Sequence, residues 1–454
     1  MEYSNIYTKG IMIRIPKDKQ ISTTFIERAI EQDREEQARK EKLIDYYNGK
    51  MAIDAKHFDD PNKPCNKLSN NFPSFITNIA CSYLYGGSSP ITYKCEDEGF
   101  LAELTAINTL NNATYTNLRN GMHISQTGIT FEVVYVDEEG NLKFSPLGSL
   151  GGIPIYSNEI EPELLAFIRY YEEVDIENRQ KIRYVELYDA NFITRYKYNT
   201  AGFELIDKKA HIFGICPVVV YYNNESVRGD YEGVLSLIDA YNTLSSNNID
   251  ESDYTNDSYL VLTGLMGTEA EDIAAMKENR VMLLPDAEAK AEFLIKNVNN
   301  SFIENQLKSI ETNIFSFSLV PNLTDENFAG NSSGVAMQYK LMGLEQLCNM
   351  KCAEYTKALR YRNRLICQYL MVLRGKSYDY MAIDYIWTRN IPKNLSEAAE
   401  TAQKLTGLVS QETQISILPL DLNAEQEMEK IDEEATRNLD PYGGDGNWMQ
   451  ESGI

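Results

Sequence analysis

The stretch YEGVLSLIDAYNTLSSNNIDESDYTN, from Tyr231 to Asn256, predicts a helix whose two halves differ in character. The first half carries an apolar stripe at helical spacing, formed by Tyr231, Val234, Leu235, Ile238, Tyr241 and Leu244. Beyond Leu244 the stripe dissolves and the helix is polar on every side. Such a helix bridges through solvent, packs against something outside the chain, or is not a helix at all. We expect that a single copy of the chain gives this half nothing to bury.

The same stretch is strongly acidic. Between Gly229 and Leu262 there is no Lys or Arg, and the acids include Glu232, Asp239, Asp250, Glu251, Asp253 and Asp257. If several copies stood around an axis, the polar helix would gain neighbours and line a channel. Duplex DNA carries one charge per ~1.7 Å, so an acidic wall would repel its phosphates evenly and let it slide. Lys308 and the loop from Asn322 to Ser333 would then make the close contacts.

A second helix is predicted from Asn300 to Leu319. Its apolar positions are spaced by four, three, four and three residues, which is a heptad seam too short to be stable alone: Ile303, Leu307, Ile310, Ile314 and Phe317. Between the two helices the sequence predicts a small insertion. It consists of a strand at YLVLTGL (259–265), a short helix around 270–277 and a strand at VMLLP (281–285).

The rest of the chain predicts an α+β protein with a mainly helical second half. A charged, largely solvated helix is expected over 22–47, with Ser22 as its N-cap, and an apolar helix follows near 75–84. Hairpins and meanders dominate 129–222. A long helix is expected over 335–374, another helix begins near Ser396, and the acidic C-terminal tail is expected to be disordered at its tip.

Composition limits the possible functions. The chain has 454 residues, 43% of them hydrophobic, which is more than one core usually supports, so two or more structural units are expected. The 43 Lys and Arg against 67 Asp and Glu give a net charge of −24. This balance argues against non-specific clamping of nucleic acid or anionic membrane, but not against guiding DNA without gripping it.

Cysteine usage and the N-terminus bear on the compartment. Seven scattered cysteines without CxxC pairing favour buried free thiols in a reducing environment. The first fifteen residues lack a secretory signal, and no apolar run is long enough to span a bilayer. We therefore expect a soluble protein made in a cytoplasm.

GNSSG, residues 330–334, has the G-x-S-x-G pattern of a hydrolase nucleophile elbow. In that fold the catalytic histidine follows the serine, whereas His57, His123 and His211 all precede Ser332. The residues before GNSSG also form a polar loop rather than a buried strand. A flexible loop that caps the next helix is the favoured interpretation, and a serine hydrolase acting through Ser332 is the remote alternative.

Three other motifs favour structural explanations. RGKS, residues 374–377, resembles the end of a phosphate-binding loop, but Leu370 stands where that loop needs a glycine, so a glycine helix cap is preferred. Cys348 and Cys352 share a helix face without further ligands, so core thiols are preferred and no metal or cofactor is predicted. A basic cluster is predicted to be a solvated face, or alternatively a phosphate-facing patch: Lys357, Arg360, Arg362 and Arg364.

Several segments in register resemble the portal proteins, or head-to-tail connectors, of tailed bacteriophages, particularly long-tailed phages and prophages of Gram-positive bacteria. They are YYNGK (46–50), NKLSNNFPSFITNIACSYLYGGSSPITY (66–93), GVLSLIDAYNTLSSNNIDESDYTNDSYLVLTG (233–264) and SSGVAMQYKLMGLEQLCNMKCAEYTKALR (332–360). The resemblance follows the whole order of segments over about three quarters of the chain. It rests on residue classes and contains no catalytic signature.

The resemblance implies a portal fold that assembles as a ring, usually of twelve subunits, around a central channel. Residues 1–230 and the long helix 335–376 would form the wing, and 231–256 and 300–320 the paired stem helices. Residues 257–299 would be the clip, 321–334 the tunnel loop, 377–420 the helices of the crown, and 421–454 an acidic tail.

The resemblance also implies sites and partners. The tunnel loop would face DNA through Asn322, Thr324, Asn327, Phe328, Asn331 and Ser332, with Gly330 and Gly334 as hinges. The stem would line the channel with Asp250, Glu251, Asp253, Asp257 and Lys308. The expected partners are further copies of the chain, double-stranded DNA, the terminase motor, head-completion and tail adaptor proteins, and the capsid and scaffold proteins.

The expected location is one vertex of the virion capsid, reached after assembly in the host cytoplasm, with no membrane contact and no catalysis by the chain itself. A helical adaptor or scaffold associated with the capsid, without a DNA channel, is the main alternative, because the heptad seam permits it.

Overall fold

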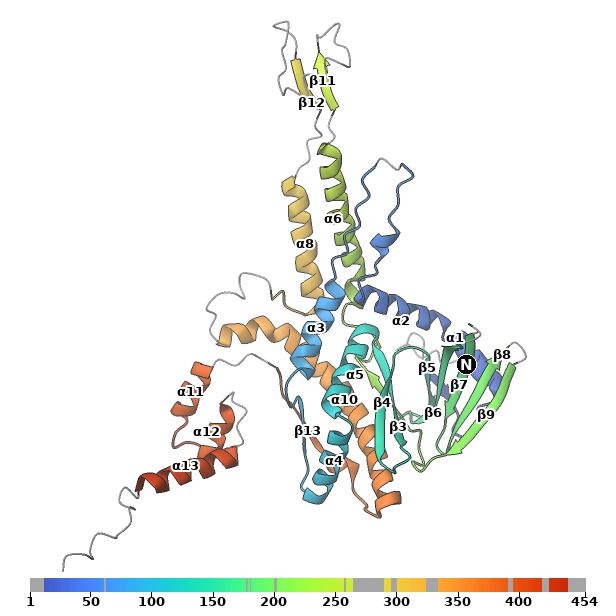
Figure 1. Ribbon diagram of the computed structural model, residues 1–454, viewed down its shortest axis with the longest axis vertical. Coiled ribbons are helices and arrows are strands. Elements are labelled where there is room, and N and C mark those ends of the chain that lie inside the picture. The colour runs from blue at the N-terminus through green and yellow to red at the C-terminus, as the bar shows by residue number, and fades with distance from the viewer. Residues whose placement is uncertain are drawn as a thin grey trace, which may run out of the picture. The chain divides into compact units, whose positions relative to one another are not determined.

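The computed structural model in Figure 1 describes residues 12–60, 63–176, 179, 181–199, 202–256, 259–263, 290–294, 300–323, 334–390, 395–418 and 424–439. The chain divides into two compact units, Met1–Arg389 and Asn390–Ile454. Helices and mainly antiparallel sheets occur together in the first unit, and the second is helical in its described part. The α+β class is therefore confirmed.

The first predicted helix is in fact two helices, α1 (Thr23–Gln32) and α2 (Arg34–Tyr47), which meet at Asp33. Ser22 is the N-cap, as predicted, and its Oγ accepts a hydrogen bond from the Phe25 N–H at 3.2 Å. The prediction of a solvated centre is wrong, because Ile26, Ala29, Lys40 and Leu43 are buried. The break at Asp33 lets its carboxylate accept a 2.7 Å hydrogen bond from the Tyr170 hydroxyl.

A six-stranded sheet with the order β1-β5-β6-β7-β8-β9 packs against α1. Only the β1–β5 pair is parallel. The meander predicted from residue 183 onward is confirmed. The strands are β1 (Ile13–Ile15), β5 (Gly152–Ser157), β6 (Leu164–Val174), β7 (Lys181–Tyr188), β8 (Phe192–Asn199) and β9 (Gly202–Ala210).

A smaller sheet, β10-β3-β4, lies at the centre of the first unit. It contains β3 (Ile129–Val136), β4 (Leu142–Gly148) and β10 (Val218–Tyr222). The predicted hairpin is confirmed, and Gly140 in its turn has a φ of +82°, which favours glycine. The surrounding helices are α3 (Phe72–Tyr85), the unpredicted α4 (Glu98–Leu110) and α5 (Ala113–Thr127), and α10 (Gly334–Arg374).

Helix α10 has 41 residues and confirms the long helix expected from the sequence. It ends at Gly375, which has a φ of +65°, and the Lys376 N–H donates to the Leu370 carbonyl at 3.1 Å. This is the geometry of a glycine helix cap, so RGKS has the structural role that was preferred. Cys348 and Cys352 are both buried, again as preferred.

The two helices that opened the sequence argument are α6 (Leu235–Asn256), preceded by the short helix η2 (Glu232–Val234), and α8 (Asn300–Ser318). They lie side by side and antiparallel (Figure 1). Beyond them β11 (Tyr259–Thr263) pairs antiparallel with β12 (Lys290–Leu294), so the first strand of the insertion is confirmed. The short helix expected at 270–277 and the strand at 281–285 lie outside the described residues.

The end of the first unit differs from the prediction of helices from residue 377. Residues 377–389 contain the short helix η3 (Tyr380–Ala382) and the strand β13 (Asp384–Trp387), which pairs with β2 (Ile91–Lys94). The second unit holds α11 (Leu395–Lys404), α12 (Gln411–Ile417) and α13 (Ala424–Leu439). The last of these shows that the acidic tail is partly helical. Among the described helices, none combines the length and apolarity needed to cross a bilayer.

Candidate functional site: the paired helices and their anchors

The polar half of α6 is covered by an extended segment of its own chain, residues 63–70, here called the strap. Three backbone N–H groups of the strap donate to side chains of α6. Asn70 donates to Asn242 Oδ1 at 2.9 Å, Leu68 to Ser246 Oγ at 3.0 Å, and Asn66 to Asp250 Oδ1 at 2.6 Å. The expectation that the half beyond Leu244 has nothing to bury in a single copy is therefore wrong: Ser246 is fully buried, as is Asn242 just before this half.

The contact works because two backbone repeats nearly coincide. The acceptors on α6 are four residues apart, which is about 6.0 Å along a helix. The donors on the strap are two residues apart, which is about 6.6 Å along an extended chain. Polar side chains on one line of α6 thus satisfy every second N–H of the strap, so the polar residues of α6 hold the strap rather than mark an unfolded segment.

Asp250 is the most heavily bonded residue of this contact. Its carboxylate pairs with Lys56 and accepts hydrogen bonds from both the backbone and the side-chain amide of Asn66. Burial opposes ionisation of Asp250, but Lys56 and Asn66 favour the carboxylate more strongly, so the pKa of Asp250 lies below its usual value. The side chain is only 12% exposed. Asp250 therefore does not present a free negative charge, because the fold brings Lys56 to a stretch that has no cation of its own.

The other residues predicted to line a channel are placed differently from one another. Asp253 is exposed and accepts a 2.8 Å hydrogen bond from the Asn66 side chain, and Glu251 is half-buried. Lys308 is exposed on α8. Asp257 lies outside the described residues. Which of these face a channel stays a prediction.

Four of the five residues of the predicted heptad seam lie on a less exposed side of α8. Ile314 is buried, and Ile303, Leu307 and Ile310 are half-buried. Phe317, however, is 69% exposed, and the next buried position after Ile314 is Ser318. The seam ends early because α8 meets α3 here, where Phe315 packs edge-on against Phe72 and Phe75, with ring centroids 5.8 and 5.6 Å apart.

The predicted tunnel loop is described only at its two ends. Asn322 donates from its side chain to Glu311 Oε1 at 3.1 Å, and Gly334 begins α10. The remaining loop residues predicted to contact DNA or to act as a hinge lie outside the described residues: Thr324, Asn327, Phe328, Gly330, Asn331 and Ser332.

A buried ion pair fixes the start of α6 to the long helix. Lys351 of α10 donates to Asp230 at 2.5 Å, and both side chains are at most 1% exposed. Asp230 also accepts hydrogen bonds from Ser125 Oγ at 2.5 Å and from the Asn223 amide at 2.8 Å. Burial lowers the pKa of Lys351, but Asp230 raises it more, so the amine stays charged. Helix α10 and the foot of α6 are thus held at one point by a satisfied charge pair.

A second buried pair overturns the interpretation of the basic cluster on α10. Arg362 is 1% exposed, and its guanidinium makes a two-pronged contact with Glu132 of β3 at 2.8 and 2.6 Å. The ring of Phe144 lies 4.4 Å from the guanidinium carbon. Lys357 and Arg360 are exposed and Arg364 is half-buried, so only part of the cluster has the predicted solvated face. Arg362 faces neither solvent nor phosphate but the central sheet.

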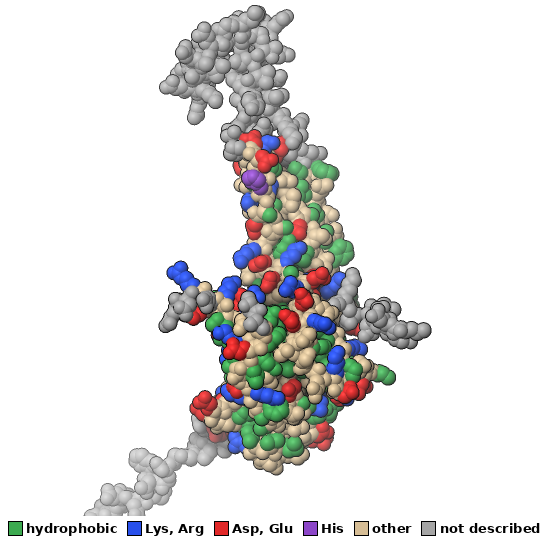
Figure 2. All heavy atoms as spheres, turned by 90° about the vertical axis from the view of Figure 1, so that its right-hand side faces the viewer, with side chains coloured by type: hydrophobic (Ala, Val, Ile, Leu, Met, Phe, Trp, Pro, Cys, Tyr) green, Lys and Arg blue, Asp and Glu red, His purple; other side chains and the backbone are tan. Residues whose placement is uncertain are grey.

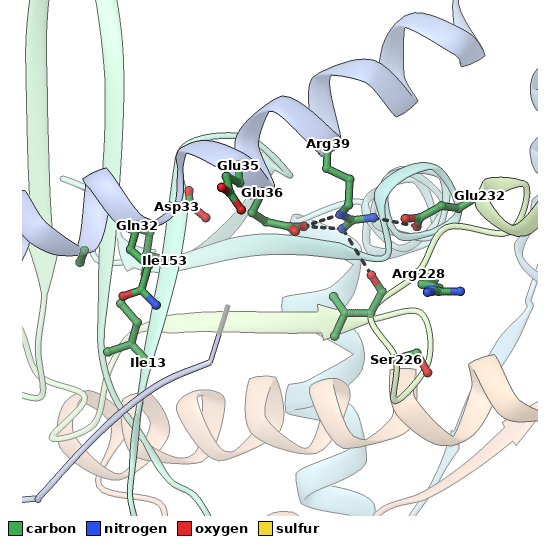
Figure 3. Close-up of a pocket in the computed structure, with 12 residues that line it drawn as sticks. Ile13, Gln32, Asp33, Glu35, Glu36, Arg39, Ile153, Ser226, Arg228 and Glu232 are labelled. Carbon is green, nitrogen blue, oxygen red and sulfur yellow. Dashed lines mark hydrogen bonds and ion pairs between the residues drawn. The ribbon is translucent and has the colours of Figure 1, made fainter. Parts of the chain in front are cut away.

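A pocket of about 490 Å³ lies between α2 and the foot of α6 (Figure 3). Arg39 crosses it, donating to Glu36, to Glu232 at 2.7 Å and to the Thr127 carbonyl at 2.9 Å. These hydrogen bonds occupy the guanidinium, so Arg39 connects α2 to η2 across the pocket. In the described parts of the chain, no three His, Cys, Asp or Glu side chains gather as a metal site.

Sequence reasoning missed the strap, Lys351, Arg362 and Arg39. The strap left one signal, the alternation of Asn66, Leu68 and Asn70, but a single extended segment cannot be assigned a partner from such a pattern. The buried cations Lys351 and Arg362 left no such signal in the sequence, because each pairs with an acid that is distant in the chain, Asp230 and Glu132 respectively.

Comparison with known proteins places the chain. Residues 26–440 match the family described as phage portal protein, SPP1 Gp6-like. The portal protein of Bacillus phage SPP1 is 23% identical, over 94% of this chain and 91% of that protein. The portal protein of Clostridium phage phiCD119 is 24% identical, over 76% of this chain and 79% of that protein. The chain belongs to the SPP1 Gp6-like family of phage portal proteins.

Proposed function

We propose that this portal protein forms a ring at one vertex of the capsid, and that double-stranded DNA passes through the centre of the ring during packaging and ejection. The helical pair α6–α8 would be the stem that surrounds the duplex, with residues 300–320 and 231–256 in each copy. The role is structural, and the energy for translocation would come from a separate terminase motor.

The observation that carries this proposal is the antiparallel pair α6–α8 together with the family match across 26–440. Residues 257–299 connect α6 to α8 in the sequence, and their described strands β11 and β12 pair with each other. We assign this segment as the clip, which would dock the terminase motor and later the tail adaptors. Residues 1–230 and 335–376 would form the wing, and the crown would begin at Asn390 with the second unit.

The chain's charge supports passage of DNA without retention. A net charge of −24 gives weak non-specific affinity for phosphates, and an exposed lysine of the pair, Lys308, would be a transient contact. Residues 321–334 would form the tunnel loop that reaches the duplex, with Gly330 and Gly334 as its hinges. The family resemblance, together with the glycine and serine content of this loop, supports that assignment.

Native mass spectrometry of the purified full-length chain tests the ring. We expect one dominant closed assembly at micromolar concentration and, in negative-stain images down its axis, a ring with a central hole. Only monomers or dimers would contradict the proposal, and a rod or shell fragment would favour a capsid adaptor without a channel.

A further inference from the structure

Among the described residues of α8, one side of the helix is largely exposed. Phe315 and Phe317 are two residues apart and so point about 200° apart around the helix. Phe315 packs against Phe72 and Phe75 of α3, whereas Phe317 is 69% exposed on the opposite side. Large aromatic side chains exposed to this extent on a long helix are common at contact surfaces between proteins.

The residues around Phe317 form a continuous face with α6. On α8 this side carries Gln306, Ser309, Asn313 and Phe317, and on α6 a line with spacings of four, three and four carries Ser236, Ala240, Thr243 and Asn247. Because the helices are antiparallel and both right-handed, these two lines lie on the same side of the pair, away from α3. We call these eight residues the uncharged face. All are exposed except Asn313, which is half-buried.

Charged side chains of α6 are turned elsewhere. Asp250 and Asp253 face the strap, and Asp239 accepts a 2.9 Å hydrogen bond from the Tyr46 hydroxyl of α2. Figure 2 looks at the strap side, where blue and red side chains gather. The separation of charge within the pair is therefore a feature of its structure and not only of its sequence.

We propose that the uncharged face is the surface through which one copy of this chain contacts the next in the ring, an inference that rests on the proposed function. Copies with a net charge of −24 repel one another. The free-energy cost of contact is lowest where no acidic side chain has to be moved or stripped of its water. The contact is heterologous, because a closed ring joins two different patches of the chain. Neighbouring copies in a closed ring are related by rotation about the ring axis, without translation along it. Phe317 therefore contacts the neighbouring copy at the same level along the stem.

Ala240→Glu in the full-length chain tests the inference. The new carboxylate would be desolvated in the contact, so we expect the ring to be lost, or to require at least a tenfold higher protein concentration, by native mass spectrometry. The matched control is Ala106→Glu on the exposed side of α4, which should assemble like the wild type. The far-ultraviolet circular dichroism spectrum should match that of the wild type in both variants, because the fold of each copy is unchanged.

Phe317→Ser keeps the inference testable if Ala240→Glu fails to fold, since the exposed ring of Phe317 contributes little within one copy. It should also weaken assembly at least tenfold. A wild-type chain that stays monomeric would sink the ring itself. If the wild type forms a ring and the Ala240→Glu ring is equally stable, only the contact assigned here is overturned. If that stable variant ring also shows altered DNA packaging, the uncharged face lies in the channel instead.

Discussion

Arg362 shows how much a single residue contributes to the first unit. Replacing it with Met leaves the Glu132 carboxylate buried without its partner, and breaking such a pair costs ~3–5 kcal/mol. We expect urea denaturation of Arg362→Met to show a loss of this size in the free energy of unfolding. The matched control is Arg360→Met on the exposed side of the same helix, which should change stability by no more than about 0.5 kcal/mol. Equal losses in the two variants would contradict the role of the pair.

Asp250 makes the strap sensitive to acid. Its pKa is lowered in the folded state, so its contribution to stability is present above the ordinary aspartate pKa of about 4 and is lost as the pH falls through the lower, folded value. Hydrogen exchange of the Asn66 and Leu68 amides, corrected for intrinsic rates, should therefore accelerate below about pH 4. Asp250→Asn should remove this pH dependence, and an unchanged profile in that variant would assign the effect to another group.

Residue-level prediction from the sequence succeeded where the partner was local and failed where it was distant. Ser22 was placed correctly as a cap because its partner, Phe25, is three residues away. Arg362 was assigned to solvent because Glu132 is 230 residues away, and charged residues are seldom buried without such a partner. The pairing of Asp250 with Lys56 was missed for the same reason, since Lys56 is remote in the chain.

At the level of elements, the strap and α6 form one unit whose stability depends on side-chain acceptors. Asn242→Ala would remove the acceptor of two part-buried hydrogen bonds, from the backbone and the side-chain amide of Asn70, at a cost of ~1–3 kcal/mol. Amides of the strap should then exchange about tenfold faster or more. Thr243→Ala, one residue further on the exposed side, is the control and should leave exchange unchanged. If both variants behave alike, the hydrogen bonds of the strap do not determine its attachment.

Elements with a strong period were predicted well. The length of α10 and the β3–β4 hairpin both follow from sequence patterns that extend over many positions. Segments without a period were not: the strap, α4 and α5 were overlooked, and the break between α1 and α2 at Asp33 has no glycine or proline to signal it.

At the level of the whole molecule, the boundary between the two units lies at Arg389 rather than near residue 377. The Trp387 indole donates to Thr356 at 3.1 Å, and Arg389 contacts Glu345 at 2.9 Å, so this segment fastens β13 to α10. We expect a chain ending at Arg389 to keep the thermal unfolding of the first unit. A chain ending at Lys376 should unfold at a clearly lower temperature, and equal melting of the two truncations would refute the boundary.

The repeats of the strap and of α6 are similar but not equal, and this difference limits how long the contact can be. Each step of about 6.6 Å on the strap gains ~0.6 Å on the 6.0 Å step of α6. Over the two steps from Asn70 to Asn66 the drift is ~1.2 Å, which side-chain rotation can absorb. In a longer strap the N–H groups would no longer be within reach of acceptors on α6. Tethering of this kind is therefore confined to the part of α6 up to about Asp250. The end of the helical pair beyond it must be oriented by the other molecules that it contacts.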